Sequence, residues 1–582
     1  MSSWGELPGT LPFHDYIYRT QRVIHAAWLL LLSTYTGDFQ PSCYFYEHDK
    51  NGSQGLLSLS IDKALTLTDH VNSVRTGNVN TGEHYVNRNT MVWHGSVPQA
   101  HSWITQNLAE SQYACLDSVL VVDGIHNADH AVCEPRAPAS LHFLFNQSQW
   151  GLQGQDATGR IHTLQTILSL MATSLTSALG AASILSDFDK RRILEWNQPV
   201  PEPPMRMTIP SGFAARVEAT PDAPAIYAWH GEMTYKELDT ASSNGALLLE
   251  SAGRSGPNDI VLFNMRKSNW ALVAALAILK SCKAIVPVDP SWPQVRLNQI
   301  GEITGASLAV CDEDTAGVLL AGSIRKIVLS PASGFSPASQ CPPPKAACAP
   351  NDLAFVLFSS GSTGVPKGML REHGTACTGS FAHAKAMHLD SASRVLQFAN
   401  HVFDVAMLDF FTTLLVGGCV CTPSETERKN DLAGFVQRSQ ANWALLTPTV
   451  ADLLDPSTVR SLKFVTLGGE SIQKATIRKW LKVCRVGINY GSAEVDVTHT
   501  RDVTNDEGIS NVGIRLPSCT AYVVDQDNPA IMLPVGAVGE LVISGPTMAR
   551  EYLNAPAKTT EVFMPTPDQW LAEGIIKEGS PP

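Results

Sequence analysis

The sequence predicts an α/β protein whose sheets are largely parallel. Short apolar runs alternate with helical stretches along most of the chain after residue 213, which is the order expected of strand–helix–strand units. One run, residues 353–358, contains no polar side chain and is predicted to be a buried strand. A loop of Ser, Gly and Thr follows that strand at once. These three observations set the fold class and direct attention to the loop.

The predicted elements follow from the pattern of apolar residues. Strands are expected at residues 225–229, 260–264, 284–288, 308–310, 327–329 and 353–358, with helical stretches such as residues 270–280 between them. Earlier helices are predicted at residues 23–37, from Ile161 to Gly180 and at residues 186–197. In the last of these, Ser186 is the predicted N-cap, and Asp187 and Asp189 favour the first turn.

The length and net charge of the chain limit the possible classes of function. A chain of 582 residues suggests three or four folding units. With 42 basic and 54 acidic residues, the net charge of -12 argues against nucleic acid and against a membrane as partners. The 12 cysteines are scattered without a Cys-x-x-Cys pair, and residues 26–32 are too short an apolar run to span a bilayer. A cytoplasmic protein with free thiols is therefore expected.

Five prolines between Pro199 and Pro210 predict a stiff linker at residues 198–212. This is the clearest domain boundary in the sequence. It separates a first region, residues 1–197, from a second region that begins at residue 213.

The loop after residues 353–358 suits a polyphosphate. Its glycines allow positive φ and close approach of the backbone to a ligand, its hydroxyls add donors, and Lys367 adds a positive charge. It is not a Walker A loop, because Lys367 follows Pro366 and precedes Gly368. A flexible connector is the alternative, but a connector needs neither a buried strand nor Pro-Lys-Gly. The predicted phosphate ligands are Ser359, Ser360, Gly361, Ser362, Thr363, Gly364 and Lys367.

This loop resembles the phosphate loop of the adenylate-forming enzymes, and its flanks resemble the amino-acid adenylation domains of nonribosomal peptide synthetases. Residues 233–238 and 279–290 are similar to further signatures of these domains, in the expected order. The resemblance implies that residues 213–565 form the large subdomain of an AMP-binding fold. It also implies ATP, Mg²⁺ and an amino acid as ligands, with acyl adenylate and pyrophosphate as products.

The nucleotide-binding residues follow from a second motif. Residues 489–494, Asn-Tyr-Gly-Ser-Ala-Glu, resemble a motif ending in Tyr-Gly-Pro-Thr-Glu. The resemblance implies that Tyr490 lies against adenine, that Glu494 binds Mg²⁺, and that Lys367 and Glu494 are the catalytic residues. It adds Gly469, Glu470 and Gly491 to the nucleotide site. This interpretation requires Lys367 and Glu494 to face one site.

One position departs from that motif. Ala493 replaces its phosphate-contacting Thr, and losing such a contact could cost roughly 1.5–3 kcal/mol. Weak use of ATP is therefore expected.

Asp404 is implied to pair with the α-ammonium of the amino acid. A carboxylate in an apolar stretch is costly unless it is paired, so a cationic ligand suits it. The alternative is a solvent-facing helix N-cap with Phe403 as its hydrophobic staple. The resemblance also implies a lining for a neutral side chain of modest size, made of Val405, Leu408, Thr449, Thr466, Gly468, Asn489, Val497 and Thr498.

The ends of the chain match the family less fully. Residues 1–197 resemble the second half of an α+β condensation domain but lack its adjacent histidines, so we expect no peptide-bond formation. His126, His130 and Cys133 are candidate metal ligands, but we favour the interpretation that they are ordinary loop residues. After residue 565 the resemblance stops, and residues 566–582 are predicted to be a tail. The expected chain therefore has neither the small C-terminal subdomain nor a phosphopantetheine attachment site.

The leading hypothesis is amino-acid adenylation in secondary-metabolite biosynthesis by a truncated synthetase, with other synthetase modules or a carrier protein as partners in trans. A catalytically dead remnant that binds nucleotide or a partner synthetase is the second hypothesis. A fatty-acyl or aryl acid ligase is a third, for which Asp404 would be an unusual residue.

Overall fold

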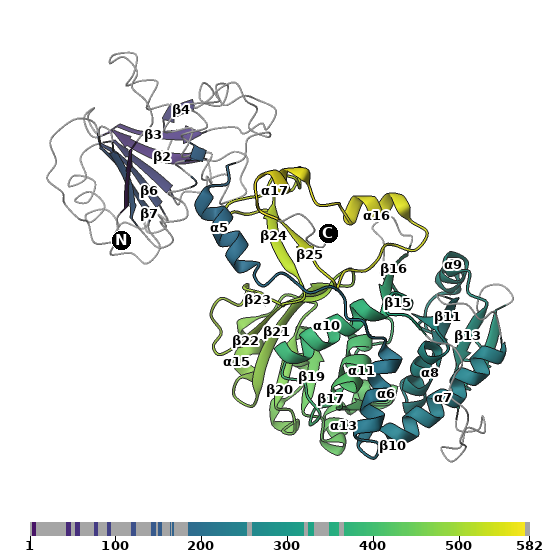
Figure 1. Cartoon of the computed structure of the whole chain (residues 1–582). Helices are drawn as coiled ribbons and strands as arrows, with labels where there is room; N and C mark the ends of the chain where they lie inside the picture. The colour runs from purple at the N-terminus through teal and green to yellow at the C-terminus, as the bar shows by residue number, and fades with distance from the viewer. Residues whose placement is uncertain are drawn as a thin grey trace. The chain divides into compact units, whose positions relative to one another are not determined.

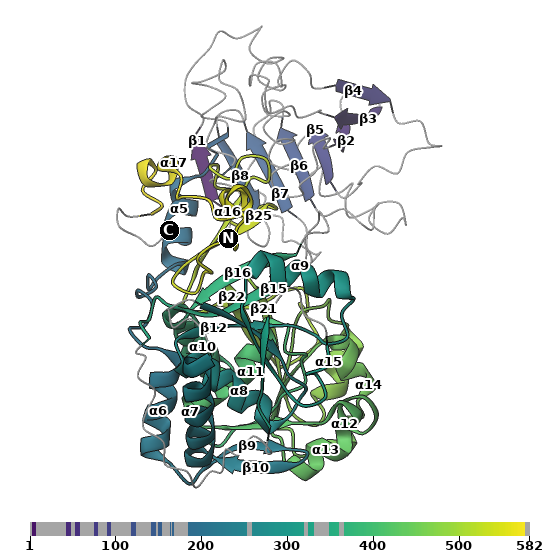
Figure 2. The same ribbon diagram turned by 90° about the vertical axis from the view of Figure 1, so that its right-hand side faces the viewer.

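The computed structural model describes residues 3–6, 42–47, 53–58, 75–78, 90–94, 118–123, 141–146, 149–153, 163, 166–167, 184–252, 259–318, 324–330, 348–359 and 366–576. The predicted helix at residues 23–37, most of the one between Ile161 and Gly180, and the trio of His126, His130 and Cys133 lie outside these residues. The chain divides into two compact units (Figures 1 and 2). The first comprises Met1–Gln198, Ala521–Val542 and Thr566–Ser580, and the second comprises Pro199–Thr520, Ile543–Pro565 and Pro581–Pro582.

The first unit contains an eight-stranded sheet in the order β1-β8-β7-β6-β5-β2-β3-β4. Its strands are β1 (Ser3–Glu6), β2 (Ser42–Glu47), β3 (Ser53–Ser58), β4 (Arg75–Asn78), β5 (Thr90–His94), β6 (Ser118–Asp123), β7 (Leu141–Asn146) and β8 (Gln149–Gln153). The resemblance of this region to half a condensation domain stays a prediction.

Helix α5 (Asp187–Trp196) belongs to the same unit and is capped by Ser186, as predicted. Its Ile193 packs in a cluster with Tyr522, Met532 and Trp570, so residues late in the chain complete this core.

The second unit is built on two sheets. The larger has nine strands in the order β10-β9-β18-β17-β19-β20-β21-β22-β23, and pairing from β9 to β21 is parallel. Its strands are β9 (Pro224–Ala228), β10 (Gly231–Thr234), β17 (Arg394–Leu396), β18 (Cys419–Thr422), β19 (Trp443–Leu446), β20 (Phe464–Leu467), β21 (Arg485–Ser492), β22 (Asp496–Val503) and β23 (Ile514–Arg515).

The smaller sheet has six strands in the order β14-β13-β11-β12-β15-β16, and only β16 is antiparallel to its neighbour. Its strands are β11 (Asp259–Asn264), β12 (Lys283–Pro287), β13 (Leu308–Cys311), β14 (Arg325–Val328), β15 (Leu353–Ser359) and β16 (Lys367–Glu372). These sheets confirm the predicted, largely parallel α/β class for this unit.

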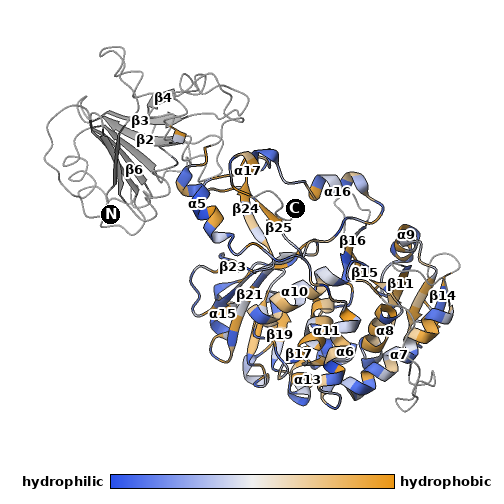
Figure 3. Cartoon of the chain, in the orientation of Figure 1, coloured by the Kyte–Doolittle hydropathy of each residue, from blue (hydrophilic) through white to orange (hydrophobic). Residues whose placement is uncertain are grey.

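Helices fill the space between the two sheets (Figure 1). All residues of α8 are buried, and Figure 3 shows this helix as mostly hydrophobic, because it packs inside one core that both sheets share. The helices of the unit are α6 (Ile209–Ala219), α7 (Tyr235–Ala252), α8 (Asn269–Lys280), α9 (Gln294–Thr304), α10 (His373–Ala386), α11 (Asp404–Val416), α12 (Glu425–Asn430), α13 (Leu432–Ser439), α14 (Pro448–Leu453), η3 (Pro456–Thr458), α15 (Lys474–Trp480) and α16 (Pro556–Val562).

The remaining elements are a two-stranded sheet of β24 (Thr520–Val524) and β25 (Glu540–Ser544), and helix α17 (Asp568–Ala572). Within the described ranges, none of the helices is both long and apolar enough to cross a membrane.

Candidate functional site

Lys367 and Glu494 lie against the same tyrosine. Lys367 opens β16, and its Nζ sits 5.8 Å from the ring centre of Tyr552. The hydroxyl of Tyr552 donates to Oε1 of Glu494 at 2.8 Å. Burial, followed by this carboxylate, raises the pKa of Tyr552, so the phenol keeps its proton and acts as the donor. The two residues therefore face one place, as the sequence interpretation required.

Backbone hydrogen bonds hold these residues in register. The peptide around Tyr552 pairs with β16, because Leu553 N donates to Gly368 O at 2.7 Å and Arg550 N donates to Leu370 O at 2.8 Å. Ala549 N also donates to Glu494 O at 2.6 Å. Residues 545–553 thus form a strap that binds the strand of Lys367 on one side and the peptide of Glu494 on the other. We call this region, with Tyr490, the nucleotide side.

The rest of the predicted phosphate loop is only partly described. Ser359 ends β15 and pairs with Lys367, so the loop leaves and re-enters the sheet at adjacent positions. Ser360, Gly361, Ser362, Thr363 and Gly364 lie outside the described residues.

The turn after β20 carries the other predicted nucleotide residues. Gly469 has φ +79°, a conformation that favours glycine. Glu470 accepts hydrogen bonds from Thr449 Oγ1 at 2.6 Å and from Thr449 N, and these bonds lower its pKa. These hydrogen bonds join Thr449, which the resemblance implied as a substrate-binding residue, to Glu470, which it implied as a nucleotide-binding residue.

Tyr490 and Gly491 lie at the exposed end of β21. Tyr490 is 44% exposed, and its ring lies at 6.1 Å from that of His499 in an edge-to-face arrangement. A Cβ on Gly491 would come within 2.0 Å of Asp496 O, so only glycine allows β22 to approach here.

Asp404 is the first residue of α11, while the N-cap is Phe403, whose side chain is 60% exposed. The proposed alternative, Asp404 as N-cap with Phe403 as its staple, is therefore wrong. Oδ1 of Asp404 accepts from Val405 N at 2.8 Å. Burial and then the charge of Asp496 raise the pKa of Asp404, which is the situation a bound cation would relieve.

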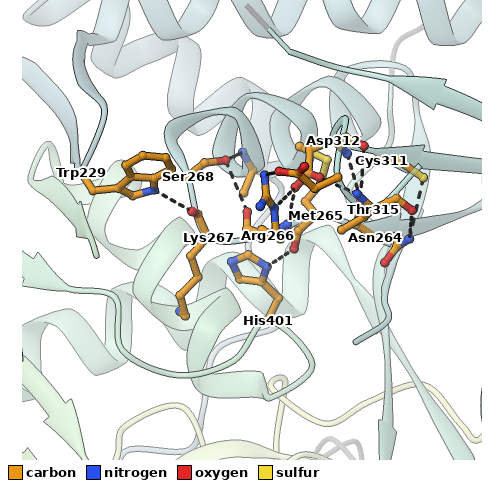
Figure 4. A network of polar contacts seen from close by, with 12 residues as sticks. Trp229, Asn264, Met265, Arg266, Lys267, Ser268, Cys311, Asp312, Thr315 and His401 are labelled. Carbon is orange, nitrogen blue, oxygen red and sulfur yellow. Dashed lines mark hydrogen bonds and ion pairs between the residues drawn. The ribbon is translucent and has the colours of Figure 1, made fainter. Parts of the chain in front are cut away.

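A buried network fixes the segment before Asp404 (Figure 4). Nδ1 of His401 lies 3.1 Å from Met265 O. Nζ of Lys267 donates to Ala399 O at 2.6 Å and to Gln397 O at 3.2 Å. Burial lowers the pKa of Lys267 to about 7, and the nearby carboxylate of Asp409 opposes that shift. The start of α11 is thus tied to the loop after β11.

The remaining substrate residues gather on neighbouring elements. Thr466 on β20 and Asn489 on β21 are buried, and Asn489 Nδ2 lies 3.2 Å from Nε2 of His383 on α10. Thr466 Oγ1 and Asn489 Oδ1 are buried atoms without a hydrogen-bond partner among the described residues. A Cβ on Gly468 would lie 2.9 Å from Asn489 O, so the turn needs glycine.

The other members fit the same surroundings. Val405 packs against the cluster that contains Leu445 and Phe464, Leu408 is buried, and Thr498 Oγ1 donates to Tyr490 O at 3.2 Å. Val497 follows Asp496 on β22 and is half-buried. We call Asp404 with these residues the substrate side.

Sequence reasoning assigned no role to Tyr552, Lys267 or Arg371. The hydroxyl of Tyr552 contacts Glu494 across 58 residues of sequence, and no local pattern predicts such a contact. The sequence gives no such signal either for Lys267, which stands between Arg266 and Ser268, or for Arg371, which precedes Glu372 and His373.

The mixed α/β fold of this unit is the fold of the adenylate-forming structures. Residues 213–553 match the family described as AMP-binding enzyme, so the chain belongs to that family.

Curated relatives are synthetases of much greater length. Nonribosomal peptide synthetase 4 from Gibberella zeae is 38% identical over 423 residues, covering 70% of this chain and 5% of the relative. FR901469 synthetase from a Dothideomycetidae species is 32% identical over 575 residues, covering 94% of this chain and 4% of the relative. The chain thus spans about one-twentieth of the length of these relatives.

Solved structures share the fold. The nonribosomal peptide synthetase FmoA3 in its AMPPNP-bound form aligns with a TM-score of 0.72 at 18% identity, covering 98% of this chain and 66% of that one. The N-terminal subdomain of Klebsiella oxytoca NpsA, in complex with 3-hydroxybenzoyl-AMSN, aligns with a TM-score of 0.54 at 21% identity. The alignment covers 61% of this chain and 91% of that one.

Proposed function

We propose that this chain adenylates an amino acid with ATP, as part of nonribosomal peptide synthesis. The observation that carries the proposal is the meeting of Lys367 and Glu494 on Tyr552, at the point where β15 and β16 lead into the candidate phosphate loop. A cation and a metal-type carboxylate at one place suit a triphosphate whose charge must be neutralised.

The residues present fit Mg²⁺. No three His, Cys, Asp or Glu side chains of the described ranges could hold a metal ion by themselves. Mg²⁺ in nucleotide enzymes is usually bound by one or two carboxylates together with substrate phosphates. The carboxylate of Glu494 accepts one hydrogen bond, from Tyr552, and its remaining lone pairs could hold the ion. When bound there, Mg²⁺ would withdraw charge from the phosphates.

In the proposed reaction a carboxylate oxygen of the amino acid bonds to the α-phosphorus, and the bond to pyrophosphate breaks. Lys367 would neutralise phosphate charge, Tyr490 would hold adenine, and Asp404 would fix the α-ammonium so that the carboxylate faces the phosphate. The alignment between these sides would supply most of the catalysis, because no proton has to move.

The substrate is proposed to have a neutral side chain of modest size. Support comes from two features of the proposed lining: Val405 and Leu408 are aliphatic, and Thr466 and Asn489 each have a buried polar atom without a partner among the described residues. Each such atom costs about 1–3 kcal/mol, which a hydrogen-bonding side chain would recover. Cognate amino acids with a hydroxyl or amide are therefore favoured over apolar isosteres.

A second candidate function is nucleotide binding without adenylation. Ala493 favours it, because this residue brings no hydroxyl to the phosphates.

ATP–pyrophosphate exchange over a panel of amino acids tests the proposal, with Lys367→Ala as the control. The expected result is exchange with one amino acid or a few related ones, lost in the variant. Exchange that survives Lys367→Ala would contradict the assignment. Calorimetric ATP binding without exchange for any amino acid would select the second function.

A further inference from the structure

Arg371 is a buried cation whose contacts the proposed reaction does not use. It lies on β16, and only 3% of the residue is exposed. Its guanidinium donates from Nη1 to Thr547 O and from Nη2 to Ala493 O, the latter at 2.9 Å. Burying a guanidinium is costly unless it is well bonded, so the interior position of Arg371 needs an explanation.

Those two carbonyls belong to the segments that form the nucleotide side. Ala493 directly precedes Glu494, and Thr547 lies in the strap of residues 545–553 that carries Tyr552. Arg371 itself is four residues after Lys367 on the same strand. One side chain therefore joins the strand of Lys367, the peptide of Glu494 and the strap.

Burial lowers the pKa of Arg371, and the charges of Asp496, Asp404 and Glu494 oppose that shift because they favour the protonated guanidinium. Gly379 on α10 leaves room for one of these carboxylates, since a Cβ there would come within 2.6 Å of Asp496 Oδ2. Carboxylates from both sides of the site thus favour the positive charge of Arg371.

We propose that Arg371 is a positioning residue: by bonding Ala493 O and Thr547 O it fixes the backbone of Glu494 and so sets how tightly the site takes up Mg²⁺ with ATP. This inference rests on the proposed role of Glu494 as the metal ligand. It assigns no contact between Arg371 and the substrates.

The test compares Arg371→Met and Arg371→Lys with a matched control, Arg394→Met. Arg394 is a half-buried arginine on β17 whose guanidinium also donates to a backbone carbonyl, Ser439 O at 2.7 Å, but it belongs to neither side of the candidate site. Two quantities are measured: the Mg²⁺ concentration for half-maximal pyrophosphate exchange, and the rise in melting temperature on adding ATP with Mg²⁺ rather than with EDTA.

Arg371→Met is expected to raise the half-saturating Mg²⁺ concentration roughly tenfold and to shrink the Mg²⁺-dependent temperature shift, since hydrogen bonds from a charged donor are worth about 1.5–3 kcal/mol. Arg371→Lys should fall between this variant and wild type, because it keeps the charge but not the fork of two donors. Arg394→Met should keep the wild-type Mg²⁺ dependence even where it lowers the melting temperature.

Equal Mg²⁺ dependence in wild type, Arg371→Lys and Arg394→Met would overturn the inference. If Arg371→Met does not fold, the result for Arg371→Lys is used instead. Absence of exchange with every amino acid would instead count against the proposed function, and the temperature shift would then test Arg371 alone. A wild-type chain with no Mg²⁺-dependent shift would overturn the inference as well.

Discussion

The nucleotide side and the substrate side of the candidate site are held in different ways. On the nucleotide side, Glu494 is fixed at its own carbonyl by Ala549, at its carboxylate by Tyr552 and at the preceding peptide by Arg371. On the substrate side, Asp404 accepts a single hydrogen bond among the described residues, from its neighbour Val405. Several hydrogen bonds hold the nucleotide side in place, whereas the buried carboxylate of Asp404 on the substrate side keeps most of its bonding capacity for a ligand.

This difference orders the expected effects of mutation. Removing one bond from the nucleotide side leaves the others in place, so the loss should be partial. Removing the charge of Asp404 would take away the whole of the proposed partner of the α-ammonium.

Asp404→Asn should therefore have the largest effect. Loss of one partner from a buried ion pair costs about 3 kcal/mol or more, so the KM for the amino acid should rise at least about a hundredfold. The KM for ATP should stay within about twofold of wild type, since the nucleotide side is untouched. Pyrophosphate exchange with each substrate varied in turn gives both constants.

The control uses a carboxylic acid that lacks the α-ammonium but is otherwise the cognate substrate. Wild type should discriminate strongly against this acid, and Asp404→Asn should not. Equal discrimination by both proteins would mean that a residue other than Asp404 binds the α-ammonium.

The second prediction concerns the network that supports the substrate side. Burial lowers the pKa of Lys267 to about 7, from 10.5 in the unfolded chain. Between these values the unfolded chain binds more protons than the native one, so stability rises with pH, by about 2 kcal/mol between pH 7 and pH 9. Lys267→Met should abolish this rise.

Urea unfolding at pH 7, 8 and 9 measures the effect. The control variant Lys558→Met should keep the wild-type slope, because the only ion pair that Lys558 forms among the described residues is with Glu561 on α16. A slope unchanged by Lys267→Met would show that other groups cause it.

The two sides also differ in what the sequence could predict. Strands β9 and β11 to β15 were predicted to within two residues, because uninterrupted apolar runs such as residues 353–358 identify buried strands without any tertiary information. Asp404 stood out for a related reason, as a carboxylate inside an apolar run. Local pattern was enough for both.

The cross-links were not predictable in that way. Arg371 bonds partners 176 and 122 residues away, and a basic residue in a short mixed segment usually faces solvent. Strand β16, which carries it, was not predicted for the same reason. Residues this far apart along the chain produce no periodic sequence pattern. Only the folded structure therefore reveals that Arg371, Tyr552 and Glu494 lie together.

The third prediction strengthens the nucleotide side. Ala493→Thr restores the hydroxyl that the family motif places beside phosphate, and should lower the KM for ATP by up to about tenfold. Ala493→Val is the matched control, because it has nearly the same shape without the hydroxyl. If both variants behave alike, the position does not contact phosphate.

The smallest effect is expected for Tyr552→Phe. This change deletes the 2.8 Å hydrogen bond to Glu494 but keeps the ring beside Lys367. A single hydrogen bond contributes about 1 kcal/mol, so the Mg²⁺ concentration for half-maximal exchange should rise about fivefold. Tyr552→Leu, which also removes the ring, should have a larger effect. If Tyr552→Phe matches wild type while Arg371→Met does not, the carboxylate of Glu494 is oriented through its backbone alone, and the nucleotide side depends on fewer bonds than its geometry suggests.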